Sequence, residues 1–254
     1  MPPRLVVTRH EASRYPYYDE VPLETEVAVD GILCLTGPKG EHVTTTFRPD
    51  LLLVATYHRI LADHIIASAS CAVNLHPSLL PEYRGAAPCY WVLRNGEPET
   101  GVTAHLLTGE VDTGPIVWQK RTKIHRHETQ GSLRKRLAQL SGQAAQDVAR
   151  QVLSRSLVGA PQPSRAEHAA PRVPASERLL DLSSPYHKVD AHFRALQPFP
   201  GALLKGEHGQ LLPVESIGKA TEDLRCLDSD VILRSGKWVL KMSRRGGLSC
   251  WYKS

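Results

Sequence analysis

Residues 72–81 form the stretch that decides the fold: Ala72-Val73-Asn74-Leu75-His76-Pro77-Ser78-Leu79-Leu80-Pro81. Its apolar start is continuous rather than alternating, which predicts a buried strand in a sheet covered on both faces. The two prolines bracket the following turn and restrict its backbone. Asn74 and His76 are two residues apart, and side chains at that spacing point to the same face of a strand. The stretch therefore predicts a strand that ends in an amide and an imidazole on one face.

Further short apolar runs precede and follow this strand. They are Leu5–Thr8, Ile32–Leu35 and Leu51–Ala55, with later strands expected at Val102–Leu106 and Ile116–Gln119. Apolar residues between Leu61 and Ala69 have helical spacing, and the clearest amphipathic helix is expected from about Thr129 to Leu157. Strands that alternate with helices predict an α/β fold with an open, mostly parallel sheet.

A change of composition follows the long helix. Residues 159–178 are rich in proline, beginning with Gly159-Ala160-Pro161-Gln162-Pro163-Ser164, which predicts a linker that runs over the surface. We therefore expect a main domain at residues 1–158, this linker, and a small C-terminal module at residues 179–254. The module contains one predicted helix, Ser184–Leu196, and several weak strand candidates.

Composition restricts the partners. The net charge of +5 and the sequence pI near 9.0 suit an anionic substrate, although scattered cations are also typical of an ordinary solvated surface. The five cysteines are odd in number, widely spaced and without a C-x-x-C pair, which indicates a reducing compartment and no structural zinc site. We find no apolar run long enough for a membrane span, and therefore expect a cytoplasmic protein with no membrane contact.

Three side chains offer a set of roles in acyl transfer. The amide of Asn74 could donate a hydrogen bond to a developing oxyanion, and His76 could transfer a proton near neutral pH. Asp112, between Gly109 and Gly114, lies in a loop that could bring its carboxylate to that imidazole. Taken singly, such residues are more often structural. Together they predict the transfer of an acyl group to an amine.

The segment from Val73 to Gln119 closely resembles the 10-formyltetrahydrofolate-dependent formyltransferases. The matching motifs, in order, are Asn74 to Pro81, Arg84-Gly85-Ala86-Ala87-Pro88, Glu99-Thr100-Gly101-Val102-Thr103 and Asp112-Thr113-Gly114. The resemblance extends more weakly to Asp50–Val54 and to Arg194–Ala202. It implies a Rossmann-like fold. Relatives open with a strand and a helix before the segment that matches Leu5–Glu11, so we expect this chain to lack the family's first strand and helix.

The resemblance also implies site residues. Asn74 would stabilise the oxyanion, His76 would transfer the proton, and Asp112 would hold His76 in its active state and help to remove the amine proton. The folate contacts would fall on two loops, namely His58, Arg59 and Ile60 in one, and Thr108, Gly109, Glu110 and Val111 in the other. No metal is implied. An arginine that contacts the co-substrate in some sugar-modifying relatives is replaced here by Ala86.

The formyl acceptor remains open at this point. Tyr90–Glu97 and Thr8–Glu11, followed by Tyr17-Tyr18, resemble the amino-sugar subgroup, which favours a nucleotide-linked amino sugar or a natural-product or siderophore amine. Methionyl-tRNA formyltransferase is the alternative, although the linker and the C-terminal module lack the basic stripe expected for tRNA. The second alternative is an inactive folate-binding homologue. A homodimer is left open.

Overall fold

The computed structural model describes residues 5–8, 33–57, 59–164, 166–206, 208–219, 232–235, 238–242 and 248–252. They form two compact units, each discontinuous in sequence. Unit 1 takes residues from 1–82, 101–120 and 138–167, and unit 2 takes residues from 83–100, 121–137 and 168–254. The predicted domain boundaries at residues 159 and 179 stay a prediction.

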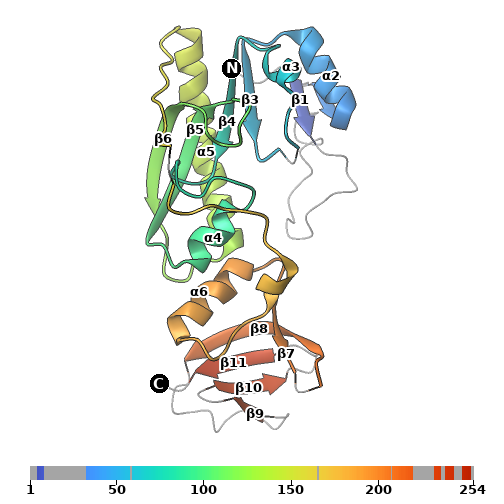
Figure 1. The fold of residues 1–254 in the computed structure, drawn as a ribbon, viewed down its shortest axis with the longest axis vertical. Helices are drawn as coiled ribbons and strands as arrows, with labels where there is room; N and C mark the ends of the chain where they lie inside the picture. Colours follow the sequence, from blue (N-terminus) through green and yellow to red (C-terminus); the bar gives the residue numbers. More distant parts are fainter. Residues whose placement is uncertain are drawn as a thin grey trace. The chain divides into compact units, whose positions relative to one another are not determined.

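The centre of unit 1 is a sheet in the order β3-β4-β5-β6 (Figure 1). Its strands are β3 (Leu51–Ala55), β4 (Cys71–His76), β5 (Glu99–Leu106) and β6 (Ile116–Lys123). β3 and β4 run parallel, as do β1 (Leu5–Thr8) and β2 (Leu33–Thr36) in a separate pair. β5 runs antiparallel to β4, which places Asn74 opposite His105. The predicted α/β fold is confirmed, and the strand that carries Asn74 and His76 lies inside the sheet.

The helices differ in length from the predicted ones. The segment predicted to be helical between Leu61 and Ala69 contains only the single turn α3 (Asp63–Ile66), and the hydroxyl of Ser68 donates to Ile65 O at 2.7 Å. Such side-chain bonds compete with helix propagation. α5 (Gln130–Leu153) ends before the predicted Leu157, where the hydroxyl of Ser154 donates to Arg150 O at 2.9 Å and Arg155 has a φ of 54°. A left-handed residue is a common way to end a helix. α2 (Gly37–Phe47) was not predicted.

Thr103 of β5 anchors the turn that follows His76. Its hydroxyl donates to Ser78 O at 2.7 Å and accepts from Leu80 N at 3.1 Å and from Gln119 Nε2 at 2.9 Å. A threonine hydroxyl has one donor and two acceptor positions, so its capacity is fully used. Thr103 is completely buried. The backbone after His76 is therefore fixed from the neighbouring strand.

Thr103→Val is expected to lower the free energy of unfolding by about 2–3 kcal/mol, because it leaves buried partners without hydrogen bonds. Thr100→Val in the same strand is the matched control. Among the described residues, the buried hydroxyl oxygen of Thr100 has no hydrogen-bond partner. Removing it should therefore leave the free energy of unfolding unchanged or raise it. Urea unfolding of both variants measures the difference. Equal losses of stability would contradict the assigned role of Thr103.

Unit 2 contains helices and a second sheet. The helices are α4 (Pro88–Arg94), α6 (Tyr186–Leu196) and the 3-10 turn η2 (Ala175–Arg178). The sheet has the order β7-β8-β11-β10-β9, with β7 (Ala202–Lys205), β8 (Leu211–Lys219), β9 (Ile232–Ser235), β10 (Trp238–Met242) and β11 (Leu248–Tyr252). The helix predicted from Ser184 begins at Tyr186, directly after Pro185, which has no N–H to donate.

Glu177 of η2 joins the helices of unit 2. Its carboxylate accepts from Tyr90 at 2.6 Å and from Arg94 Nε at 3.3 Å, and His192 Nε2 lies 2.6 Å from its backbone oxygen. Burial favours the neutral acid, but the hydrogen bonds from Tyr90 and Arg94 outweigh it and hold the pKa of Glu177 below its ordinary value. Burial lowers the pKa of His192. Part of the predicted linker is thus fastened by a polar cluster.

In the described part of the chain, no helix combines the length and apolar character needed to cross a membrane.

Candidate active site

The structure places the three predicted catalytic side chains together in unit 1. Asn74 Nδ2 donates to Asp112 Oδ1 at 3.3 Å, and His76 Nδ1 lies 3.5 Å from Asp112 Oδ2. Asn74 and His76 reach the same carboxylate because they occupy alternate positions of β4. Asp112 comes from the loop between β5 and β6, and its side chain is 10% exposed. One carboxylate is therefore shared by an amide and an imidazole.

His105 is a fourth member of this group. It is 1% exposed, and its Nε2 lies 3.1 Å from Asn74 Nδ2 and 3.4 Å from Asp112 Oδ1. The sequence predicts a strand through His105 but not its neighbour, because cross-strand register does not follow from local pattern. The sequence feature that could have indicated His105 is a histidine inside a predicted strand directly before the predicted catalytic loop.

The hydrogen bonds define the proton positions of this group. A carboxylate only accepts, so the Asn74 atom facing Asp112 is the nitrogen. His105 Nδ1 lies 2.9 Å from Leu106 O, which can only accept, so this nitrogen carries a proton. His105 Nε2 is then the atom that accepts from Asn74 Nδ2. His105 thus holds one N–H of Asn74, and Asp112 holds the other.

The loop of Asp112 has a constrained backbone. Asp112 has a φ of 55°, a left-handed conformation that aspartate tolerates better than most non-glycine residues. A Cβ at Gly114 would lie 1.8 Å from Leu106 O, so only glycine fits there. The hydroxyl of Thr113 donates to Glu110 O at 3.3 Å. The local conformation that turns the Asp112 carboxylate towards β4 is therefore fixed by residues on either side.

This arrangement suits acyl transfer. A positioned amide N–H can stabilise an oxyanion, and an imidazole beside a carboxylate can move a proton. Among the described residues, no group of three or more histidine, cysteine, aspartate or glutamate side chains has the arrangement of metal ligands.

Two loops carry the predicted folate contacts, and the second of them is the loop that also carries Asp112. His58 lies outside the described residues, whereas Ile60 is 84% exposed. Arg59 Nε lies 3.4 Å from Glu41 Oε1, which also accepts from Tyr57 at 2.7 Å. Burial and this hydrogen bond raise the pKa of Tyr57 to about 12. In the second loop, Thr108 to Glu110 are partly or fully exposed, and Val111 is 55% exposed. Each loop thus presents an apolar side chain that could cover an aromatic ligand.

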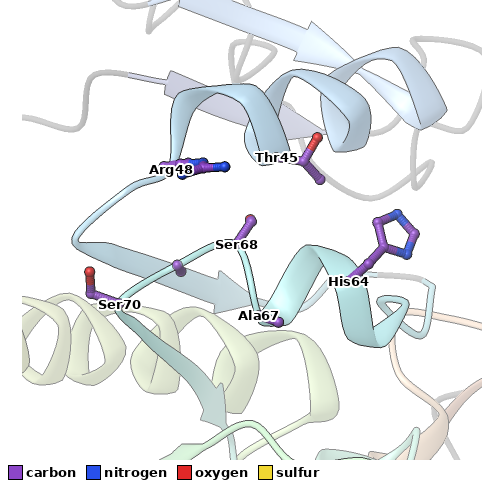
Figure 2. A pocket seen from close by; sticks show the side chains of 7 residues that line it. Thr45, Arg48, His64, Ala67, Ser68 and Ser70 are labelled. Atoms are coloured by element: carbon purple, nitrogen blue, oxygen red, sulfur yellow. The ribbon is translucent and has the colours of Figure 1, made fainter.

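A separate hollow of about 660 Å³ lies between α2, α3 and the start of β4 (Figure 2). Its lining residues are Thr45, Arg48, His64, Ala67, Ser68, Ala69 and Ser70. Ser70 precedes the first residue of β4, whereas His76 is the last residue of that strand. At a rise of about 3.3 Å per residue the two are roughly 20 Å apart, so this hollow is distinct from the Asp112 cluster.

The sequence is similar to known formyltransferases. Residues 36–149 match the family model described as formyl transferase. Methionyl-tRNA formyltransferase of Myxococcus xanthus is 37% identical over 158 residues, which cover 61% of this chain and 50% of that protein. The same enzyme of Parvibaculum lavamentivorans is 32% identical, over 82% of this chain and 70% of that protein. The chain thus spans half of the first relative and more of the second.

Solved structures share the fold. A 4-N formyltransferase from Francisella tularensis superposes with a TM-score of 0.67 at 18% identity, covering 83% of this chain and 95% of that one. WlaRD is a sugar 3N-formyltransferase crystallised in the presence of dTDP and 5-N-formyl-tetrahydrofolate. It superposes with a TM-score of 0.65 at 15% identity, and the match covers 96% of this chain and 85% of WlaRD. These likenesses show an α/β fold shared with formyltransferases of known structure. The match to the family model and the 32% identity to the Parvibaculum enzyme show that the chain belongs to the formyl transferase family.

Proposed function

We propose that this protein is an N-formyltransferase that moves the formyl group of 10-formyltetrahydrofolate to a primary amine of a small molecule. The amine would belong to a nucleotide-linked amino sugar or to a natural-product or siderophore intermediate. The observation that carries the proposal is the convergence of Asn74 Nδ2 and His76 Nδ1 on the carboxylate of Asp112. Membership of the formyl transferase family supports 10-formyltetrahydrofolate as the formyl donor.

Each residue has a role in this proposal. The amine nitrogen adds to the formyl carbon of 10-formyltetrahydrofolate, which puts negative charge on the formyl oxygen, and the bond from that carbon to N10 then breaks. Asn74 donates a hydrogen bond to the formyl oxygen as negative charge develops there. Asp112 takes the proton that the amine loses, directly or through water. His76 stabilises the same negative charge and delivers a proton to the departing N10, which balances the transfer.

The exposed apolar side chains of Ile60 and Val111 support the proposal that these two loops bind the folate. Both lie in unit 1, as do the four clustered residues. A pterin is a flat ring, and exposed apolar side chains are common at ligand sites. Arg59 and the loop Thr108 to Val111 would complete the contact, much of it through backbone atoms.

Two likenesses bear on the acceptor. WlaRD, a sugar 3N-formyltransferase, is matched over 96% of this chain and 85% of its own, so both units of this chain have counterparts in a sugar-modifying enzyme. The tRNA acceptor is the second candidate, and it is favoured by identities of 37% and 32% to methionyl-tRNA formyltransferases. These relatives are matched over only 50% and 70% of their length. The linker and the C-terminal module lack the strong basic stripe expected of a tRNA-binding surface, and we therefore place the small amine first.

The acceptor is tested by offering 10-formyltetrahydrofolate with dTDP- and UDP-linked amino sugars, hydroxyornithine and charged initiator tRNA. We expect release of tetrahydrofolate with one of the small amines and a product heavier by one formyl group. The matched control is His76→Ala, which should form no product. Formylation of the tRNA alone would refute the small-molecule acceptor. Binding of 10-formyltetrahydrofolate without any turnover would identify an inactive homologue.

A further inference from the structure

The start of the predicted linker runs beside the Asp112 loop within unit 1. Ile116 N donates to Ala160 O at 2.7 Å, and Ala160 N donates to Ile116 O at 2.8 Å. A Cβ at Gly159 would lie 2.8 Å from Pro115 Cβ, so the two segments are tightly packed. This antiparallel bridge brings the next residues of the linker alongside Asp112, Thr113 and Gly114.

Gln162 fastens that loop. Its Nε2 donates to Asp112 O at 3.0 Å and to Gly114 O at 2.7 Å, across 50 residues of sequence in the first case. A primary amide nitrogen has two hydrogens and can serve both carbonyls at once. The two carbonyls flank Thr113, so the bonds hold the peptide units that follow the left-handed Asp112.

We propose that Gln162 is a positioning residue for Asp112, holding its backbone in the conformation that directs the carboxylate to Asn74 and His76. The proposal rests on the proposed formyl transfer, since positioning affects turnover only if Asp112 takes part in the reaction. Without this clamp, the pair of hydrogen bonds from Gln162, the left-handed backbone at Asp112 would change conformation in part of the molecules. Small displacements of a reacting group can cost about 10²-fold in rate.

The proposed role of Gln162 is tested with variants that remove the two hydrogen bonds donated by its amide. Gln162→Glu keeps the length of the side chain but turns acceptor oxygens towards two carbonyl oxygens, which also accept. Gln162→Met keeps the length without a donor or a charge, and it replaces Gln162→Glu if that variant fails to fold. Gln143→Glu is the matched control, because Gln143 is an exposed amide of α5 that accepts from Lys120 and does not contact the loop.

The full chain is assayed with 10-formyltetrahydrofolate and the acceptor found in the panel. We expect Gln162→Glu to lower kcat about 10- to 100-fold, to leave the KM for the acceptor within threefold, and to alter the pH profile of kcat. A purely structural residue would lower the amount of folded protein and leave that profile unchanged. Gln143→Glu should retain kcat within twofold.

Hydrogen–deuterium exchange of residues 106–116 separates this proposal from the proposed function. Gln162→Glu should speed exchange there at least tenfold while exchange in β3 and β4 stays unchanged, whether or not the wild-type protein forms product. Faster exchange without wild-type turnover would overturn the formyl transfer and support the clamp. Unchanged exchange, or a kcat within twofold of wild type, would overturn the clamp.

Discussion

Asp112→Asn is expected to lower kcat by about 10²–10⁴-fold, the range that proton-transfer groups contribute. The variant keeps the shape of the side chain but removes the charge that lies 3.5 Å from His76 Nδ1 and 3.4 Å from His105 Nε2. An asparagine amide cannot take the proton that the amine loses, so the loss of kcat should persist across the pH range. Steady-state kinetics over a range of pH measure this loss.

The control for this variant is Asp147→Asn. Asp147 lies on α5 and accepts from Trp118 Nε1 at 2.9 Å, without contact to the clustered site residues. Its replacement should leave kcat within twofold of wild type. If Asp112→Asn retained more than one fifth of the wild-type kcat, Asp112 would have no part in proton transfer.

Asn74→Ala is expected to lower kcat by about 10²–10³-fold while the KM for 10-formyltetrahydrofolate stays within threefold. A hydrogen bond that strengthens as negative charge develops raises kcat, whereas one made equally in the bound substrate lowers KM. His105 retains one N–H of Asn74, and the N–H now directed to Asp112 is the one that would pass to the formyl oxygen. Steady-state titration of the donor separates the two constants.

Asn95→Ala provides the comparison for Asn74. Asn95 Nδ2 donates to the hydroxyl of Tyr83 at 3.0 Å in unit 2. Its loss removes the same side-chain amide from another place, and kcat should stay within twofold of wild type. A raised KM with an unchanged kcat in Asn74→Ala would instead make Asn74 a substrate-binding group.

Local sequence pattern predicted the strand of the site well. The expected run Ala72–Leu75 lies within β4 (Cys71–His76), and Leu51–Ala55 has the same bounds as β3. These positions are predictable because burial on both faces requires continuous apolar residues. Alternation along the strand then placed Asn74 and His76 on one face. α4, which begins at Pro88, was not predicted as a helix.

The partners of the site could not be predicted in the same way. His105 lies opposite Asn74 because β5 runs antiparallel to β4, and register between strands depends on contacts far apart in the sequence. Gln162 belongs to a proline-rich segment whose composition indicates a linker, and composition does not say which loop such a segment contacts. The catalytic roles and the folate contacts stay predictions.

The hydrogen bonds from Gln162 to the Asp112 loop limit where segments can be exchanged between related enzymes. A crossover at residue 158 would take the first 158 residues from one parent and Ala160 and Gln162 from the other. The Asp112 loop would then meet a foreign segment in place of the bridge at Ile116 and the amide at Gln162. A hybrid enzyme should therefore be joined after Gln162, so that each parent keeps its own loop and fastening together.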